Sequence, residues 1–128
     1  VSIGSYVNCS ATDCRLRSDV EKKLQEAYRY ADEKGYTLTV VSAYRTVEEQ
    51  QKLHKKIGDL ACGSFTPYES CPHVRGIAVD VTLNGMERNL GKPDYNETND
   101  LHRTLRKIME NAGFNNYNHE YWHFYVNE

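Results

Sequence analysis

The stretch "CPHVRGIAVDVTL", residues 71–83, constrains the fold of this chain more than any other segment. Its second half is rich in β-branched residues and predicts a strand over 77–83. Alternate side chains of a strand share a face, so the apolar odd-numbered residues would face a core, whereas Ala78, Asp80 and Thr82 would face the other way. Burying a carboxylate costs free energy unless a positive partner meets it. We therefore expect Asp80 to face a cavity that contains a positive charge.

A histidine precedes this strand in a setting that predicts a turn. Pro72 restricts the backbone just before His73, and Gly76 permits the chain to reverse just after it. Such a turn would bring the His73 side chain back toward the cavity that Asp80 faces.

The C-terminal segment "HEYWHFYV", residues 119–126, predicts a final strand over about 121–126. On it, Trp122, Phe124 and Val126 would pack inward, and Tyr121, His123 and Tyr125 would take the opposite face. One histidine on a strand is usually a structural residue. Together, however, His73, Asp80 and His123 form the two-histidine, one-carboxylate set of a catalytic zinc site with an open fourth position. A divalent ion would also compensate the Asp80 charge.

A carboxylate lies close to the last of these ligands. Glu120 comes three residues before His123 and could act as general base toward a zinc-activated water, then pass the proton to the leaving amine. Residues three apart on a regular strand point to opposite faces. The chain must therefore break its regular strand geometry near 119–121.

The other regular elements have recognisable signals. Ser18-Asp19-Val20-Glu21 forms a capping box, after which apolar residues recur at helical spacing until Gly35. A second capping box, Thr46-Val47-Glu48-Glu49, predicts a helix that ends near Gly58. A third helix carries Leu101, Leu105, Ile108, Met109 and Ala112 on one face and stops at Gly113.

These elements predict the fold class. A strand is expected over 36–42, polar loops over 58–72 and 84–97, and an irregular arm over 1–17. The connections are too irregular for a doubly wound sheet. We expect an α+β fold in which a small, largely antiparallel sheet packs against about three helices, with the zinc site in the cleft on the sheet.

Size and charge limit the function classes. With 128 residues the chain predicts a single domain over 1–128 and a monomer. Sixteen Lys and Arg against 18 Asp and Glu leave a net charge of −2, which argues against a nucleic-acid partner. No apolar run approaches the length of a membrane span. The remaining histidines, His54, His102 and His119, are expected at the surface.

Four cysteines bear on the compartment. Their spacing favours Cys9–Cys14 and Cys62–Cys71 disulfides, one of three possible pairings, and an extracytoplasmic location. Four free thiols in the cytoplasm, or Cys71 and His73 as a metal-binding pair, are the alternatives. The chain starts at Val1 without a visible secretion signal, which fits a mature protein whose leader has been removed as well as a trimmed chain.

The ordered motifs resemble a known family. His73-x-x-Gly76-x-Ala78-x-Asp80, followed by Glu120-x-Trp122-His123, is similar to the zinc signature of the M15 metallopeptidases, and "VVSAYRTVEEQ", residues 40–50, resembles a third family segment. The resemblance covers residues 18–126. The M15 family includes D-Ala-D-Ala dipeptidases of the vancomycin-resistance type, D,D-carboxypeptidases and some phage endolysins. The wider superfamily also contains the lysostaphin-type enzymes and the hedgehog signalling domain.

The resemblance implies roles for individual residues. His73, Asp80 and His123 would hold one Zn²⁺, Glu120 would be the catalytic acid and base, and Arg45 would stabilise the oxyanion. Gln50 matches a substrate-positioning residue of the carboxypeptidases. Cys71 stands where the family usually has a substrate-binding serine. A disulfide at Cys71 would prevent it from donating a hydrogen bond and would instead brace the loop that carries His73.

The resemblance also implies a substrate class, a D-alanine-containing dipeptide or a peptidoglycan stem peptide. "SAYRTVEEQ" resembles the carboxypeptidases, whereas "HVRGIAVDVTL", "NLGKPDY" and "LRKIMENAGF" followed by "EYWHF" resemble the dipeptidases, and this second set favours the dipeptidase branch. A carboxypeptidase or a peptidoglycan endopeptidase is the alternative. A hedgehog-like zinc module that only binds partners would need neither Glu120 nor Arg45.

Overall fold

The computed structural model describes residues 1–3, 8–11, 13–57, 71–84, 91–117 and 119–127. In chain order the elements are β1 (Asn8–Cys9), α1 (Ser18–Glu33), β2 (Leu38–Ser42), α2 (Val47–Ile57), β3 (Ala78–Leu83), α3 (Asp100–Asn111), β4 (Asn115–Asn116) and β5 (His123–Tyr125). Each predicted helix and strand is present, although β5 is shorter than expected. The two-residue strands β1 and β4 were not predicted, because two residues carry no measurable periodicity.

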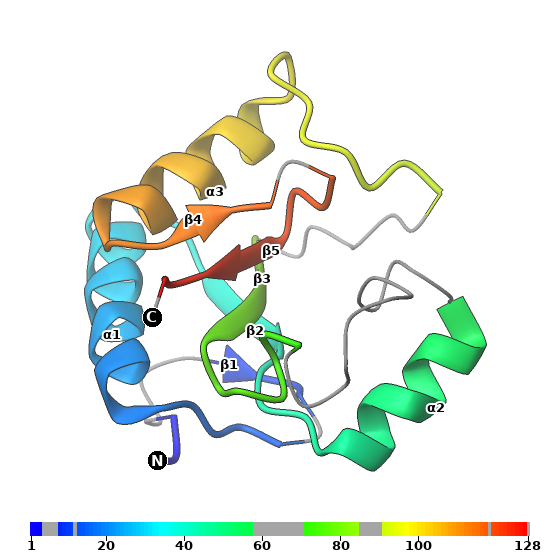
Figure 1. Ribbon diagram of the computed structural model, residues 1–128. Helices are drawn as coiled ribbons and strands as arrows, with labels where there is room; N and C mark the ends of the chain where they lie inside the picture. Colours follow the sequence, from blue (N-terminus) through cyan, green and yellow to red (C-terminus); the bar gives the residue numbers. More distant parts are fainter. Residues whose placement is uncertain (4–7, 12, 58–70, 85–90, 118, 128) are drawn as a thin grey trace.

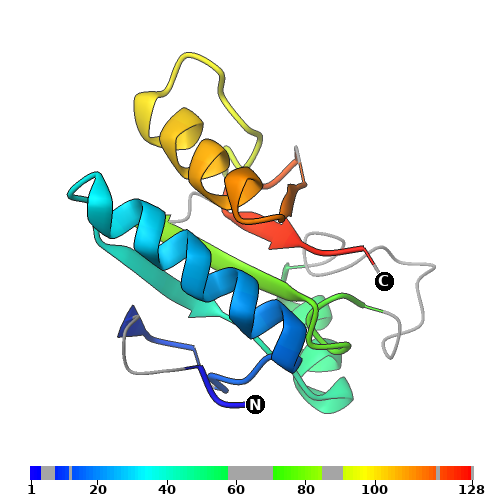
Figure 2. The same ribbon diagram turned by 90° about the vertical axis from the view of Figure 1, so that its left-hand side faces the viewer.

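The strands form one mixed sheet in the order β1-β2-β3-β5-β4. Strand β1 runs parallel to β2, and every other neighbouring pair is antiparallel. Helix α1 lies across one face of the sheet with α3 beside it, while α2 stands apart at the other end of the molecule (Figures 1 and 2). This arrangement confirms the α+β class with a largely antiparallel sheet.

The core lies between the sheet and the pair α1 and α3. It is filled by side chains that are at most 1 % exposed, among them Val20, Leu24, Ala27, Leu38, Val40, Val79, Val81, Leu83, Leu105, Ile108, Met109 and Phe124. The apolar stripes expected on both helices and on β3 are therefore buried as predicted. Ala78, Asp80 and Thr82 face away from this core but are also covered, each at most 4 % exposed.

The N-termini of α1 and α2 are stabilised by different kinds of contact. Thr46 and Glu49 form the predicted capping box, because the Thr46 hydroxyl accepts from the Glu49 N–H and the Glu49 carboxylate accepts from the Thr46 N–H. The predicted capping box of α1 is wrong. Its N-cap is Arg17, which makes no side-chain cap, and the Arg17 N–H donates to the carbonyl of Gly76 at 3.0 Å. A tertiary contact replaces the local signal there.

Among the described residues, no helix is both long enough and apolar enough to cross a bilayer.

Candidate metal centre and active site

Three side chains from distant parts of the chain converge beside the sheet. His73 precedes β3, Asp80 lies on β3 and His123 begins β5, and one ligand atom from each lies within 4.8 Å of the others. The Oδ1 atom of Asp80 is 3.2 Å from Nε2 of His73 and 2.9 Å from Nδ1 of His123. The structure therefore brings together the three residues that the sequence nominated as ligands.

Strand pairing explains why residues 43 positions apart meet. Asp80 and His123 are direct partners in the antiparallel β3–β5 register, so their side chains lie next to each other on one face. The turn before β3 supplies His73, because the Gly76 N–H donates to the His73 carbonyl at 3.2 Å. Gly76 has a φ of +73°, a left-handed conformation that favours glycine, as the sequence predicted.

The end of β2 holds His73 from the other side. Nδ1 of His73 lies 2.7 Å from the carbonyl oxygen of Ala43, and the Arg45 N–H donates to the His73 carbonyl at 3.1 Å. A carbonyl oxygen only accepts, so Nδ1 carries a proton, and in the neutral imidazole the Nε2 lone pair faces Asp80. Backbone carbonyls commonly orient metal-binding histidines in this way.

These protonation states suit a divalent cation. Burial lowers the pKa of His73 and favours its neutral form. Burial alone would raise the pKa of Asp80, but the imidazoles of His73 and His123 hold it well below its usual range. Asp80 is therefore a carboxylate, and when His73 is neutral its Nε2 lone pair and Oδ1 of Asp80 face each other at 3.2 Å as two acceptors with no hydrogen between them. A cation between them would satisfy both, and this donor set fits Zn²⁺.

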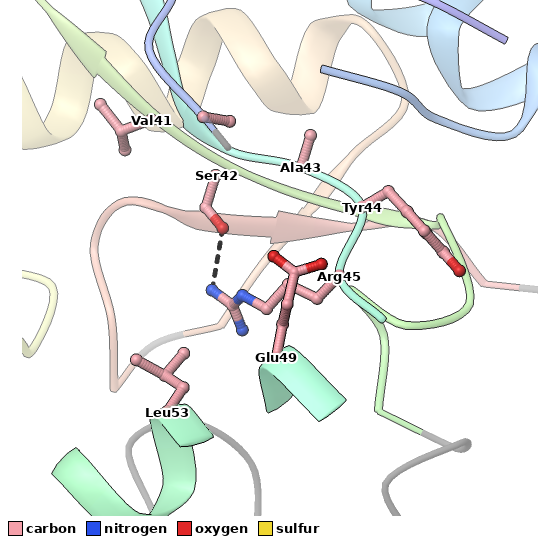
Figure 3. Close-up of a pocket in the computed structure, with 8 residues that line it drawn as sticks. Val41, Ser42, Ala43, Tyr44, Arg45, Glu49 and Leu53 are labelled. Atoms are coloured by element: carbon pink, nitrogen blue, oxygen red, sulfur yellow. Dashed lines mark hydrogen bonds between the residues drawn. The ribbon is translucent and has the colours of Figure 1, made fainter. Parts of the chain in front are cut away.

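Arg45 lies next to the metal ligands. Its Nη2 is 3.5 Å from Oδ2 of Asp80 and donates to the Ser42 hydroxyl at 2.9 Å, and its Nη1 donates to Oε1 of Gln50 at 3.1 Å. Gln50 is fully buried, so its amide oxygen contacts Arg45 from the protein interior. Figure 3 shows the guanidinium between Ser42 and helix α2, on the wall of a cavity of about 240 Å³.

An irregularity in β2 creates this arrangement. The β2–β3 register shifts between Val40 and Ser42, which places Ser42 opposite Asp80. Such bulges re-aim side chains and often lie beside active sites. Ser42 could not be nominated from the sequence, because a bulge has no signal in the alternation of apolar residues.

Glu120 lies on a bent approach to β5. Its N–H donates to the Tyr117 carbonyl at 2.9 Å, and its own carbonyl accepts from the His123 N–H at 3.1 Å. The regular strand begins only at His123. This confirms the predicted break near 119–121 and explains why β5 is shorter than expected. The Glu120 side chain is 7 % exposed.

The cysteines agree with an oxidised protein. Cys9 and Cys14 form a disulfide with an S–S distance of 2.06 Å, and Cys71 is disulfide-bonded and 1 % exposed. Cys71 therefore has no thiol hydrogen to donate to a substrate, which argues against its nomination as a binding residue. Its expected partner, Cys62, lies outside the described residues.

His102 corrects one expectation, since it is buried rather than on the surface. It is 8 % exposed, its ring stacks on Tyr121 at 3.8 Å, and its Nδ1 accepts the Asn96 N–H at 3.0 Å. His102 thus links α3 to the segment that carries Glu120. His119 is exposed as expected, and His54 is partly exposed.

The buried imidazole of His102 predicts a pH effect on stability. Burial lowers its pKa in the folded state below the usual value of about 6.5. The unfolded chain therefore binds the proton more readily, so the contribution of His102 is present above pH 6.5 and declines as the pH falls below it. Urea unfolding of the wild type and of His102→Gln should show a stability difference that narrows between pH 7.5 and pH 5.5. A pH-independent difference would contradict this account.

One family model and several solved structures match this chain. The model of the VanY family, D-alanyl-D-alanine carboxypeptidase, matches residues 13–127. The LdcB LD-carboxypeptidase structure has a TM-score of 0.64 and 23 % identity, covering 87 % of this chain and 58 % of its own. The D,D-pentapeptidase VanY of a VanB-type resistance cassette, in complex with Zn(II), has a TM-score of 0.59 and 20 % identity, covering 90 % and 75 %.

A third solved structure is similar to the same extent. The D,D-dipeptidase VanXYg, in complex with a phosphinate analogue of D-Ala-D-Ala, has a TM-score of 0.60 and 25 % identity, covering 87 % of this chain and 50 % of that chain. This chain thus spans little more than half of LdcB and half of VanXYg. No curated protein sequence matches it. Because the family model covers nearly all of the sequence, the chain belongs to the VanY family of D-alanyl-D-alanine carboxypeptidases, among the M15 peptidases.

Proposed function

We propose that this chain is a zinc-dependent D,D-carboxypeptidase that removes the terminal D-alanine from a peptidoglycan stem peptide. The observation that carries the proposal is the convergence of His73, Asp80 and His123 beside the Arg45 guanidinium. The motifs in the sequence favoured the dipeptidase branch. The match to the VanY family supports the carboxypeptidase instead.

Each residue near the site has a role in this proposal. A zinc ion held by His73, Asp80 and His123 would supply a Lewis acid for the peptide carbonyl and lower the pKa of water. Glu120 takes the proton of the attacking water and delivers it to the leaving amine. Arg45 offsets the negative charge that develops on the carbonyl oxygen.

Gln50 acts through Arg45 in this account. Its amide oxygen accepts from the guanidinium, and full burial keeps it from a substrate in the cleft. Ser42 holds the other end of the same guanidinium. Held in place by these two acceptors, the Arg45 guanidinium can stabilise a developing negative charge without reorganising during the reaction.

Product analysis tests the branch. The zinc-loaded protein should release D-alanine from a stem pentapeptide ending in D-Ala-D-Ala and should hydrolyse the free dipeptide far more slowly. A chelator should abolish release, and added zinc should restore it. Faster hydrolysis of the free dipeptide would assign the chain to the dipeptidases, a candidate favoured by its 25 % identity to VanXYg. Cleavage within the stem would assign it to the endopeptidases.

A binding-only zinc module, as in the hedgehog-like domains, is the candidate of another class. It predicts stoichiometric zinc without turnover of either peptide. The presence of both Glu120 and Arg45 favours the enzyme, because a binding module has no need of a proton acceptor together with a cation that stabilises an oxyanion.

Location, domain extent and oligomeric state belong to the same proposal. We infer a single M15-type peptidase domain over 1–128 that acts as a monomer outside the cytoplasm. Its substrate class lies in the cell wall, and the Cys9–Cys14 disulfide is consistent with an oxidising compartment.

A further inference from the structure

One side-chain amide contacts three carbonyl groups of the segment that carries Glu120 and His123. Asn116 lies on β4, the edge strand that precedes this segment. Its Nδ2 is 3.0 Å from the carbonyl oxygen of His123, 3.3 Å from that of Glu120 and 3.5 Å from that of Tyr121. The two amide hydrogens are therefore shared among three acceptors.

These contacts supplement a short set of backbone hydrogen bonds. The Tyr117 N–H donates to the His123 carbonyl at 3.0 Å, and the His123 N–H donates to the Glu120 carbonyl at 3.1 Å. The His123 and Glu120 carbonyls thus each accept from Asn116 as well as from the backbone. Asn116 links the start of β5 to the residue proposed as general base, across a stretch that is not part of a regular strand.

The same side chain is incompletely satisfied. Its Oδ1 is buried and has no hydrogen-bond partner, the sole such atom among the described residues. Reversing the amide would bring Oδ1 against three carbonyl oxygens, so the observed orientation is the favourable one. A buried acceptor without a partner destabilises the fold. The presence of asparagine at position 116 therefore needs a reason other than its contribution to overall stability.

We propose that Asn116 is a positioning residue that holds Glu120 and His123 in their relative orientation. This inference rests on the proposed role of Glu120. The amide group is needed because its single nitrogen carries two hydrogens, which it can donate to the Glu120 and His123 carbonyls on the two sides of the bend. Asp at this position would present only acceptors to them, and Ala would present nothing.

Asn115 provides a matched control, since it is the same residue type on the same strand. It is similarly half-buried, and its side chain makes no hydrogen bond with the part of the chain that the structure describes. The test compares Asn116→Ala, Asn116→Asp and Asn115→Ala in the full chain. Both Asn116 variants should lower kcat for the stem pentapeptide by about 10²-fold with KM changed less than about twofold, and Asn115→Ala should match the wild type.

Trp122 provides a readout that does not depend on turnover. It is the only tryptophan of the chain, lies between Glu120 and His123, and is 1 % exposed. In the metal-free protein, acrylamide should quench its fluorescence more strongly in both Asn116 variants than in the wild type or Asn115→Ala. If the wild type turns over no peptide but this difference is present, the peptidase proposal fails and the positioning of the bend stands.

Several results would overturn the inference. Equal kcat in Asn116→Ala and Asn115→Ala would do so, as would Asn116→Asp with wild-type activity. A rise in KM alone would make Asn116 a substrate contact. Circular dichroism checks folding, and if Asn116→Asp does not fold, Asn116→Ala decides the test. Loss of the folded state in both variants would also refute the proposal, because Asn116 would then support the fold as a whole.

Discussion

Glu120→Gln is expected to lower kcat by about 10²–10⁴-fold while one zinc ion remains bound per chain. Glutamine keeps the size of the side chain but cannot accept the proton of the attacking water. Glu120 is not one of the three side chains that could hold the metal, so its replacement leaves His73, Asp80 and His123 in place. Steady-state kinetics on the stem pentapeptide and metal analysis of the same samples provide the two measurements.

The matched control for this experiment is Glu48→Gln, an exposed glutamate in the first turn of α2. It should retain wild-type kcat. Unchanged kcat in Glu120→Gln would remove Glu120 from the mechanism. Loss of zinc from that variant would instead make Glu120 a fourth ligand.

His73→Ala should weaken zinc binding by more than about 10²-fold and reduce activity to the background. Removal of residues that merely orient a ligand already costs 10–100-fold in affinity, and His73 is expected to bind the metal directly. Its Nε2 lone pair faces Asp80 from a fully enclosed position, 3 % exposed. Competition with a chromophoric chelator measures the affinity, and circular dichroism checks that the variant folds.

His119→Ala serves as the control, because the His119 side chain is 72 % exposed and contacts Asp94 and the Tyr117 ring at the surface. It should bind zinc as tightly as the wild type. A fully metallated His73→Ala protein would refute the ligand assignment. In that case Asp80→Asn would show whether the remaining two side chains hold the ion.

The residues of the metal centre could be nominated from the sequence because their signals are local. Strand alternation put Asp80 on the face opposite to Val79 and Val81, and Gly76 marked the turn that returns His73 to that face. Glu120 and His123 are three residues apart and would point to opposite faces of a regular strand, and this predicted the bend at Glu120. Residue-by-residue resemblance to a peptidase family added Arg45 and Gln50.

Other features depended on contacts between residues far apart in the chain. The start of α1 is set by Gly76 rather than by Ser18, and His102 is buried because Tyr121 stacks on it. Neither partner can be read from the segment in which the residue lies. Propensity and periodicity describe one element at a time, so a polar residue that finds a tertiary partner is indistinguishable from one at the surface.

The sequence by itself determined which atoms could bind a metal and which faces of the strands and helices would be buried, since both follow from residue identity and from the repeats of 2.0 and 3.6 residues. Only the tertiary structure decided how those atoms are held. The register shift at β2, the Ala43 carbonyl on His73 and the Asn116 amide on the bend all arise when separate elements pack together. Their positions depend on the packing of the whole domain, which no single segment encodes.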